Sequence, residues 1–106
     1  MLEGPKGLKS SLYADNKAVA LKSIDNLPPI IQPKVKNFFK GGSNGYVDFS
    51  VEEISGGSYI VKMTKPGNIP GSMAIYYKVI DANGNTKRVY KETYDPKGNL
   101  LHIKDK

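Results

Sequence analysis

The sequence predicts an α+β domain in which short N-terminal helices pack on an antiparallel β-meander of four to five strands. Apolar residues recur at helical spacing before residue 42 and alternate with polar residues after Gly45. Two turn motifs, Asn83-Gly84 and Asp95-Pro96-Lys97-Gly98, are typical of hairpins. The 106 residues suit one domain, which we divide into a flexible lead (1–10), a helical part (11–42) and a sheet (46–104).

Two helices are expected in the helical part. Asp15 or Asn16 can cap a first helix that runs to about Asn26. Pro28-Pro29 is expected to start a second helix, because proline is tolerated in a first turn, and Gly41-Gly42 to end it. The second helix carries one apolar stripe, which we interpret as core packing: Ile31, Val35, Phe38 and Phe39.

Five strands are expected after Gly45, at about residues 47–52, 58–65, 73–81, 86–94 and 99–104. Residues 65–72 hold two prolines and two glycines and are expected to form an irregular loop. If Asn83-Gly84 closes a two-residue loop, Lys78 lies opposite Val89 and Tyr76 opposite Lys91.

That pairing sorts the residues of the two central strands onto two faces. One face carries Ala74, Tyr76, Lys78, Lys91 and Thr93. The other carries Met73, Ile75, Tyr77, Val79, Arg88, Tyr90, Glu92 and Tyr94. The second set is the more apolar, so we expect the helices to cover it and the first set to lie open to a ligand.

The single histidine, His102, can lie on either face, depending on the last turn. A two-residue loop places it opposite Lys91 and points Leu101 and Ile103 to the core. A three-residue loop with a bulge, which Gly98 favours, places it opposite Glu92. We prefer the first register because it satisfies the apolar pattern.

The charge of the chain is concentrated in its C-terminal half. Residues 1–53 hold seven lysines against six acidic residues, whereas residues 54–106 hold nine basic residues against four acidic ones. Thus five of the six net positive charges lie in the second half. Such a surface attracts polyanions, although a basic surface can also serve solubility alone.

The residues of the lysine-bearing face suit cleavage of RNA by its own 2′-hydroxyl. That reaction needs a base, cations beside the phosphoryl oxygens and an acid for the leaving oxygen. The candidate catalytic residues are His102, Lys91, Lys78 and Thr93. The candidate RNA-binding residues are Lys62, Lys65, Tyr76, Ser72 and Lys104.

Several other chemistries find little support in the sequence. The chain has no cysteine, which excludes thiolate nucleophiles and cysteine-bound metals. The acids of the basic half lie mostly at turns or the terminus, so we expect no metal site and no cofactor. No apolar run is long enough to cross a membrane, and no signal-peptide pattern opens the chain.

The C-terminal stretch also resembles toxin domains at the ends of bacterial polymorphic toxins of the contact-dependent inhibition, Rhs and LXG types. The resemblance covers about the last fifty residues and lies in Lys62 to Gly67, Pro70-Gly71-Ser72, Tyr76, Lys78, Gly84, Thr86, Lys91 to Asn99 and His102-Ile103-Lys104. These residues are similar to the group of ribonucleases that includes barnase, EndoU, the ribonuclease colicins and RelE.

The resemblance implies a metal-independent endoribonuclease that acts on tRNA or another structured RNA. It also implies delivery, by secretion or from a cell surface, into the cytoplasm of a target bacterium. It further implies a cognate immunity protein that plugs the cleft, and we expect the chain to be a monomer. The positions that match the family are Lys78, Lys91, Thr93 and His102. The chain lacks the second histidine of some members, so a lysine or tyrosine would take that role. The alternatives are a non-catalytic nucleic-acid-binding module and a protein-interaction domain, such as an immunity or phage structural protein.

Overall fold

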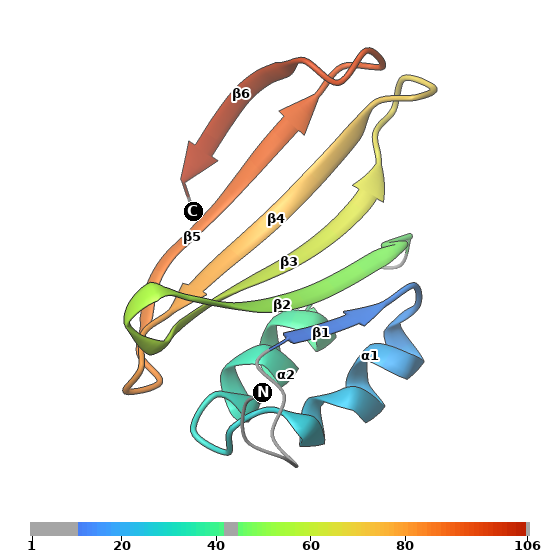
Figure 1. Cartoon of the computed structure of the whole chain (residues 1–106). Helices are drawn as coiled ribbons and strands as arrows, with labels where there is room; N and C mark the ends of the chain where they lie inside the picture. The colour runs from blue at the N-terminus through green and yellow to red at the C-terminus, as the bar shows by residue number, and fades with distance from the viewer. Residues whose placement is uncertain (1–10, 42–44, 106) are drawn as a thin grey trace, which may run out of the picture.

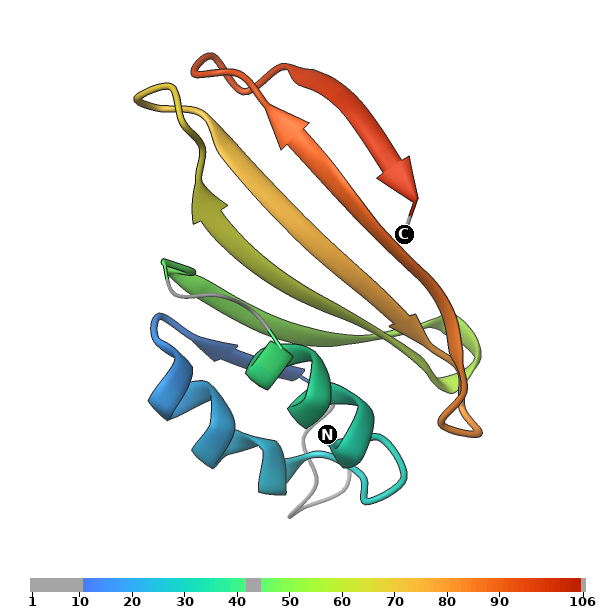
Figure 2. The same ribbon diagram turned by 180° about the vertical axis from the view of Figure 1, so that it is seen from behind.

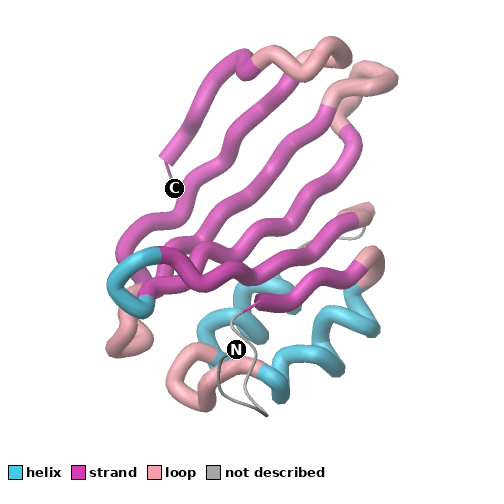
Figure 3. The backbone as a smooth tube through the Cα atoms, in the orientation of Figure 1, coloured by secondary structure: helices cyan, strands magenta, loops and turns pink. Residues whose placement is uncertain are grey.

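The computed structural model describes residues 11–41 and 45–105, which fold as helices beside one antiparallel sheet (Figures 1 and 3). The order is β1 (Ser11–Ala14), α1 (Lys17–Ser23), the 3-10 turn η1 (Ile24–Asn26), α2 (Gln32–Gly41), β2 (Asp48–Ile54), the short turn η2 (Ser55–Gly57), β3 (Ser58–Pro66), β4 (Met73–Ile80), β5 (Thr86–Tyr94) and β6 (Leu100–Asp105). The six strands of this described sheet lie in sequence order. The α+β meander is confirmed, with more strands than the four to five expected. The predicted lead, 1–10, lies outside the described residues.

The additional strand is β1, which we had expected to belong to the helical part. It pairs with β2, so that Leu12 lies opposite Val51 and Ala14 opposite Phe49. Leu12 and Ala14 are buried while Ser11 and Tyr13 are exposed. Four residues give only two alternations, too few to show a strand period in the sequence.

The helix boundaries follow from local hydrogen bonds. The Asn16 side chain accepts a hydrogen bond from the Val19 amide at 2.9 Å, so the predicted cap is confirmed. The proline pair was expected to start the second helix, but that prediction is wrong. The Pro28 carbonyl accepts hydrogen bonds from Ile31 and Gln32 in a turn, and α2 begins only at Gln32. Pro33 then occupies the first helical turn, where a missing N–H costs little.

The hydrophobic core lies between the two helices and the first three strands. Val35 and Phe39 of α2 are fully buried, as are Phe49, Val51 and Val61 of the sheet. The Phe39 and Phe49 rings meet edge to face, with centroids 5.2 Å apart. Each such side chain contributes about 1.5–3 kcal/mol through burial, so this half of the sheet holds most of the apolar stabilisation.

The helices cover the face of the sheet opposite to the one predicted. Val61 pairs with Lys78 and Met63 with Tyr76, so the lysine-bearing side of β4 continues the buried side of β3. The apolar pattern of β4 and β5 suggested that the helices cover the other face. The register between β3 and β4 instead places the lysine-bearing side of β4 on the helix-covered face. Figures 1 and 2 show that the helices pack against the β1 and β2 side of the sheet and leave β5 and β6 uncovered.

Both C-terminal hairpins close with the same motif, Asp-x-x-Gly-Asn, at residues 81–85 and 95–99. In each, the aspartate Oδ1 accepts hydrogen bonds from the second and fourth following amides at 2.8–2.9 Å. The loops are three-residue turns with a glycine at positive φ, so the two-residue loops preferred from the sequence are wrong. The pairing register shifts beside each turn, between Val79 and Ile80 on β4 and between Thr93 and Tyr94 on β5. In each case the extra residue lies on the strand that follows the turn.

The first shift restores the predicted pairing, because Lys78 does lie opposite Val89 and Tyr76 opposite Lys91. The second shift places His102 opposite Thr93 and Lys104 opposite Lys91. Neither register considered for His102 is correct, yet it shares a face with Lys91 as preferred. Leu101 and Ile103 were expected in the core but are 58% and 48% exposed. The helices of the described structure lie beside β1 and β2, away from β6 (Figures 1 and 2).

Candidate nucleic-acid interface

The helix-side surface of the last three strands gathers most of the predicted site residues. We call it the lysine face, and it comprises Ala74, Tyr76, Lys78, Val89, Lys91, Thr93, His102 and Lys104. Its Lys78 end lies under α2, and its Ala74 end runs to the loop at residues 67–72. The two ends therefore have different surroundings and can take part in different chemistry.

Tyr76 stands between two lysines at the open end of this face. The Lys91 ammonium lies 5.3 Å from the centre of the Tyr76 ring, and the Lys65 ammonium lies 5.7 Å from it. Lys65 also approaches the Tyr46 ring at 5.3 Å, and Tyr46 meets Tyr76 edge to face at 5.7 Å. Aromatic rings hold ammonium groups at such distances, so Tyr76 positions one positive charge from β3 and one from β5.

A cavity of about 360 Å³ opens beside this pair of lysines. Five of the predicted site residues line it together: Lys65, Ser72, Tyr76, Lys91 and Thr93. Its volume lies in the range of about 300–1,000 Å³ that is usual for small-molecule sites. The loop after β3 and the turn after β5 supply its remaining walls.

The hydroxyl of Thr93 lacks a hydrogen-bond partner in this cavity wall. Within the described residues, Thr93 Oγ1 is the one buried side-chain nitrogen or oxygen without such a partner. A buried hydroxyl without a partner costs about 1–3 kcal/mol, and native proteins retain few of them. A ligand group that reaches this atom would give it a hydrogen-bond partner.

His102 and Lys104 border the lysine pair on the neighbouring strand. His102 lies directly opposite Thr93, and Lys104 directly opposite Lys91. Side chains opposed in this way have Cβ atoms about 4.5–5.5 Å apart. Both residues are exposed, so the imidazole and the ammonium group are accessible to a large ligand.

Lys78 shares the lysine face but does not lie open, contrary to the prediction. Its Nζ donates a hydrogen bond to the Lys34 carbonyl of α2 at 3.2 Å and lies 5.9 Å from the centre of the Phe38 ring. Partial burial, and then the charge of Lys34, lower the pKa of this ammonium group. Lys78 therefore joins the helices to the sheet rather than the cavity.

Lys62 lies on the opposite face of the sheet, away from the other candidate residues. It pairs with Tyr77, and its ammonium lies 5.7 Å from the centre of that ring. Tyr77 stacks on Tyr90 at 4.5 Å, and the Arg88 guanidinium covers Tyr90 at 4.1 Å. The two rings thus contact each other and each contacts a cation, so the row stabilises the sheet face that the described helices leave uncovered.

Glu92 and Tyr94 extend that row. Tyr94 donates a hydrogen bond to Glu92 at 2.7 Å. Burial, and then a hydrogen bond with Glu92, raise the pKa of Tyr77 far above its usual range, so this phenol stays protonated at neutral pH. Arg88 also bridges to Asp105 at 2.7 Å, which fastens the end of β6.

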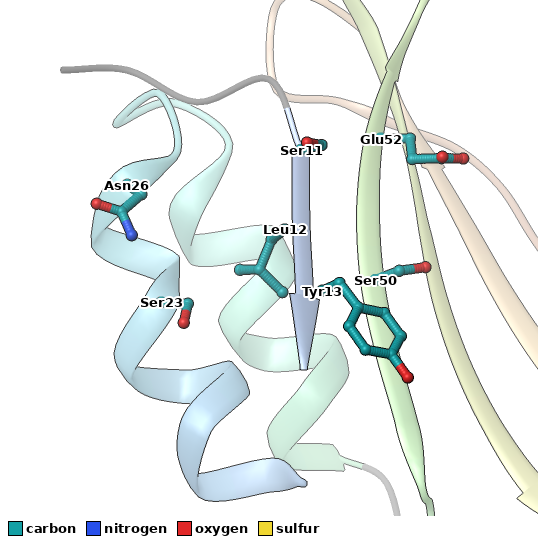
Figure 4. A pocket seen from close by; sticks show the side chains of 7 residues that line it. All are labelled: Ser11, Leu12, Tyr13, Ser23, Asn26, Ser50 and Glu52. Carbon is teal, nitrogen blue, oxygen red and sulfur yellow. The ribbon is translucent and has the colours of Figure 1, made fainter. Parts of the chain in front are cut away.

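A second cavity, of about 400 Å³, lies at the outer edge of β1. Figure 4 shows that its side chains do not converge: Leu12 points toward the helices, whereas Tyr13 and Glu52 point to the other side of the sheet. Tyr13 also donates a hydrogen bond to Asp48. No lysine or histidine lines this cavity among the described residues, so it does not share the chemistry of the lysine face.

Sequence reasoning missed Tyr46, which contacts the cavity residue Tyr76, and part of the wall of the first cavity. Tyr46 sits in the short segment before β2, and its contact with Tyr76 depends on pairing between strands far apart in the sequence. Pro96 and Leu101 looked like a turn residue and a core residue, respectively, but both line the cavity. The proline-rich loop before Ser72 was a usable signal, because long irregular loops often carry function.

The described residues, 11–41 and 45–105, show neither a metal centre nor a membrane-spanning helix. They contain no group of three or more His, Asp or Glu side chains arranged to hold a metal ion. They also contain no helix with the length and apolar character needed to cross a bilayer. No protein-family model, curated protein or solved structure matches the chain.

Proposed function

We propose that this chain is an endoribonuclease domain that cleaves RNA without a divalent metal ion. The observation that carries the proposal is the grouping of Lys65, Lys91 and Thr93 around one cavity, with His102 opposite Thr93 on the adjacent strand. Paired ammonium groups suit a phosphodiester, and an exposed imidazole beside them suits proton transfer.

The proposed reaction uses the 2′-hydroxyl of the RNA as the nucleophile. His102 accepts the proton of this hydroxyl, whose oxygen attacks phosphorus as the bond to the 5′-oxygen breaks. Lys91 donates a proton to the departing 5′-oxygen, and Lys65 stabilises the charge on the phosphoryl oxygens. The products are a 2′,3′-cyclic phosphate and a 5′-hydroxyl. Exchange with water then takes the extra proton from His102 and gives one to Lys91.

The wider biological setting implied by the resemblance stays a prediction. A toxin domain of this kind would act on tRNA or another structured RNA in a target bacterium and would be neutralised by an immunity protein. The net charge of +6 is compatible with both an RNA substrate and an acidic inhibitor.

The decisive experiment incubates the chain with total tRNA in EDTA and maps the new RNA ends. We expect cyclic-phosphate ends from the wild type and a loss of roughly a hundredfold or more in His102→Ala, the usual contribution of a proton-transfer residue. Ile103→Ala is the matched control, because Ile103 is exposed on the same strand but lies opposite Glu92. Intact RNA with the wild-type chain would overturn the proposal.

A non-catalytic RNA-binding module is the second candidate. It is favoured by one observation: no hydrogen bond from another described residue orients the exposed His102 imidazole. A catalytic base is commonly held by a further group. This candidate predicts retained, salt-dependent RNA binding without cleavage, and equal behaviour of His102→Ala and the wild type.

A further inference from the structure

The cavity beside Tyr76 has two chemically unlike ends. Lys65 and Lys91 supply positive charge at one end. Apolar side chains line the other end: Pro66, Ile69, Met73, Pro96 and Leu101. A ligand that fills the whole cavity therefore combines an anionic group with a flat or compact apolar group.

The apolar end is formed by two turns that support each other. The Gly67 amide donates to the Ser72 carbonyl at 2.9 Å, and the Ser72 amide and hydroxyl both donate to the Ile69 carbonyl, at 2.9 and 2.6 Å. A Cβ at Gly71 would lie 3.1 Å from Pro96 Cβ, which shows how closely the loop meets the β5–β6 turn. Because these hydrogen bonds are internal, the walls are largely formed before any ligand binds.

The charges around the cavity give the ligand one orientation. Asp95 lies at the apolar end, where its carboxylate accepts hydrogen bonds from the amides of Lys97 and Asn99. Those bonds lower the pKa of Asp95, so the carboxylate is negative at neutral pH. A phosphate is therefore repelled from the turn and attracted to the lysines, while an uncharged group occupies the apolar end.

We infer that this cavity seats one unpaired nucleobase, with its attached phosphate on Lys65 and Lys91. The inference rests on the proposed function for the choice of RNA as ligand. Thr93 supplies a hydroxyl that can hydrogen-bond to the base once its side chain rotates. A base stacked inside a duplex cannot enter such a cavity, so the chain selects single-stranded RNA or a loop.

The test measures binding of nucleoside 3′-monophosphates to the whole chain by NMR titration, with inorganic phosphate and ribose 5-phosphate for comparison. We expect at least one nucleotide to bind roughly fivefold or more tightly than either phosphate, because base contacts with apolar and aromatic groups contribute to affinity. The shifted amides should lie in residues 67–72 and 95–101.

Leu101→Ala and Ile103→Ala form a matched pair for this titration. Both side chains are exposed, and both lie on β6, but only Leu101 lines the cavity. We expect Leu101→Ala to weaken nucleotide binding about threefold or more and to leave phosphate binding unchanged, whereas Ile103→Ala should leave both unchanged. Circular dichroism on both variants verifies that the fold is retained.

Three results would overturn the inference: nucleotides that bind no more tightly than phosphate, equal behaviour of the two variants, or a duplex bound as tightly as a single strand of equal length. Preferential binding of decanoate over every nucleotide would also overturn it, in favour of a lipid-like anion. Failure of the proposed cleavage can be distinguished from failure of this inference. If nucleotides bind at the cavity but RNA stays intact, the cleavage proposal is overturned and the base site is supported.

Discussion

At the scale of single residues, a substitution at Thr93 should affect protein stability and RNA cleavage in different ways. Val has the shape of Thr without its hydroxyl, so Thr93→Val removes the buried oxygen that has no partner. We expect the free energy of unfolding to stay equal or rise by about 1–2 kcal/mol, and RNA cleavage to fall. Urea unfolding and the cyclic-phosphate assay measure the two effects.

Thr64→Val is the control for that substitution. Thr64 is a partly exposed β3 residue that pairs with Ile75, outside the cavity. It should change neither stability nor cleavage appreciably. Loss of stability in Thr93→Val would instead mean that the hydroxyl is satisfied within the folded chain.

At the scale of elements, the two Asp-x-x-Gly-Asn turns provide an internal comparison. Gly84 and Gly98 have nearly the same φ, +85° and +86°, where a side chain is strained by about 1–2 kcal/mol. A Cβ at Gly84 would lie 2.9 Å from Ile30 Cγ1 and 3.0 Å from the Ile30 carbonyl, whereas Gly98 has open space. Gly84→Ala should therefore destabilise the protein by about 1–3 kcal/mol more than Gly98→Ala.

Thermal or urea unfolding of the two glycine variants measures this difference directly. The backbone strain is nearly the same in both variants. The difference between their free energies of unfolding therefore reports how tightly the β4–β5 turn packs on the segment before α2. Equal destabilisation would show that this packing relaxes without cost.

These turns also explain how far the sequence could predict the elements. Their glycines and asparagines indicated hairpins, and the hairpins formed. The loop lengths were wrong because the aspartate of each turn accepts two backbone hydrogen bonds, which closes a three-residue turn. A bulge in the following strand then corrects the register, so the residues of the lysine face were grouped correctly through two errors that cancel. The exposure of its Lys78 end was predicted wrongly, because that end lies under α2.

At the scale of the whole molecule, the sheet is divided into a covered and an open part. The helices bury one face of the first three strands, while the row of Lys62, Tyr77, Tyr90 and Arg88 stabilises the opposite face of β3 to β5. The open end of the lysine face is thus left free for a ligand. The sequence could not show this division, because it depends on the β3–β4 register across a long loop.

That division makes the position of each lysine matter more than the net charge. Lys65 and Lys91 face the cavity, whereas Lys78 is bonded to α2 and Lys62 lies on the other side of the sheet. For single-stranded RNA, each lost phosphate contact lowers the slope of log affinity against log salt by about 0.7. We expect this decrease in Lys65→Gln and in Lys91→Gln, but not in Lys62→Gln or Lys78→Gln. All four variants remove one positive charge, so equal slopes among them would mean that diffuse charge, rather than a defined site, holds the RNA.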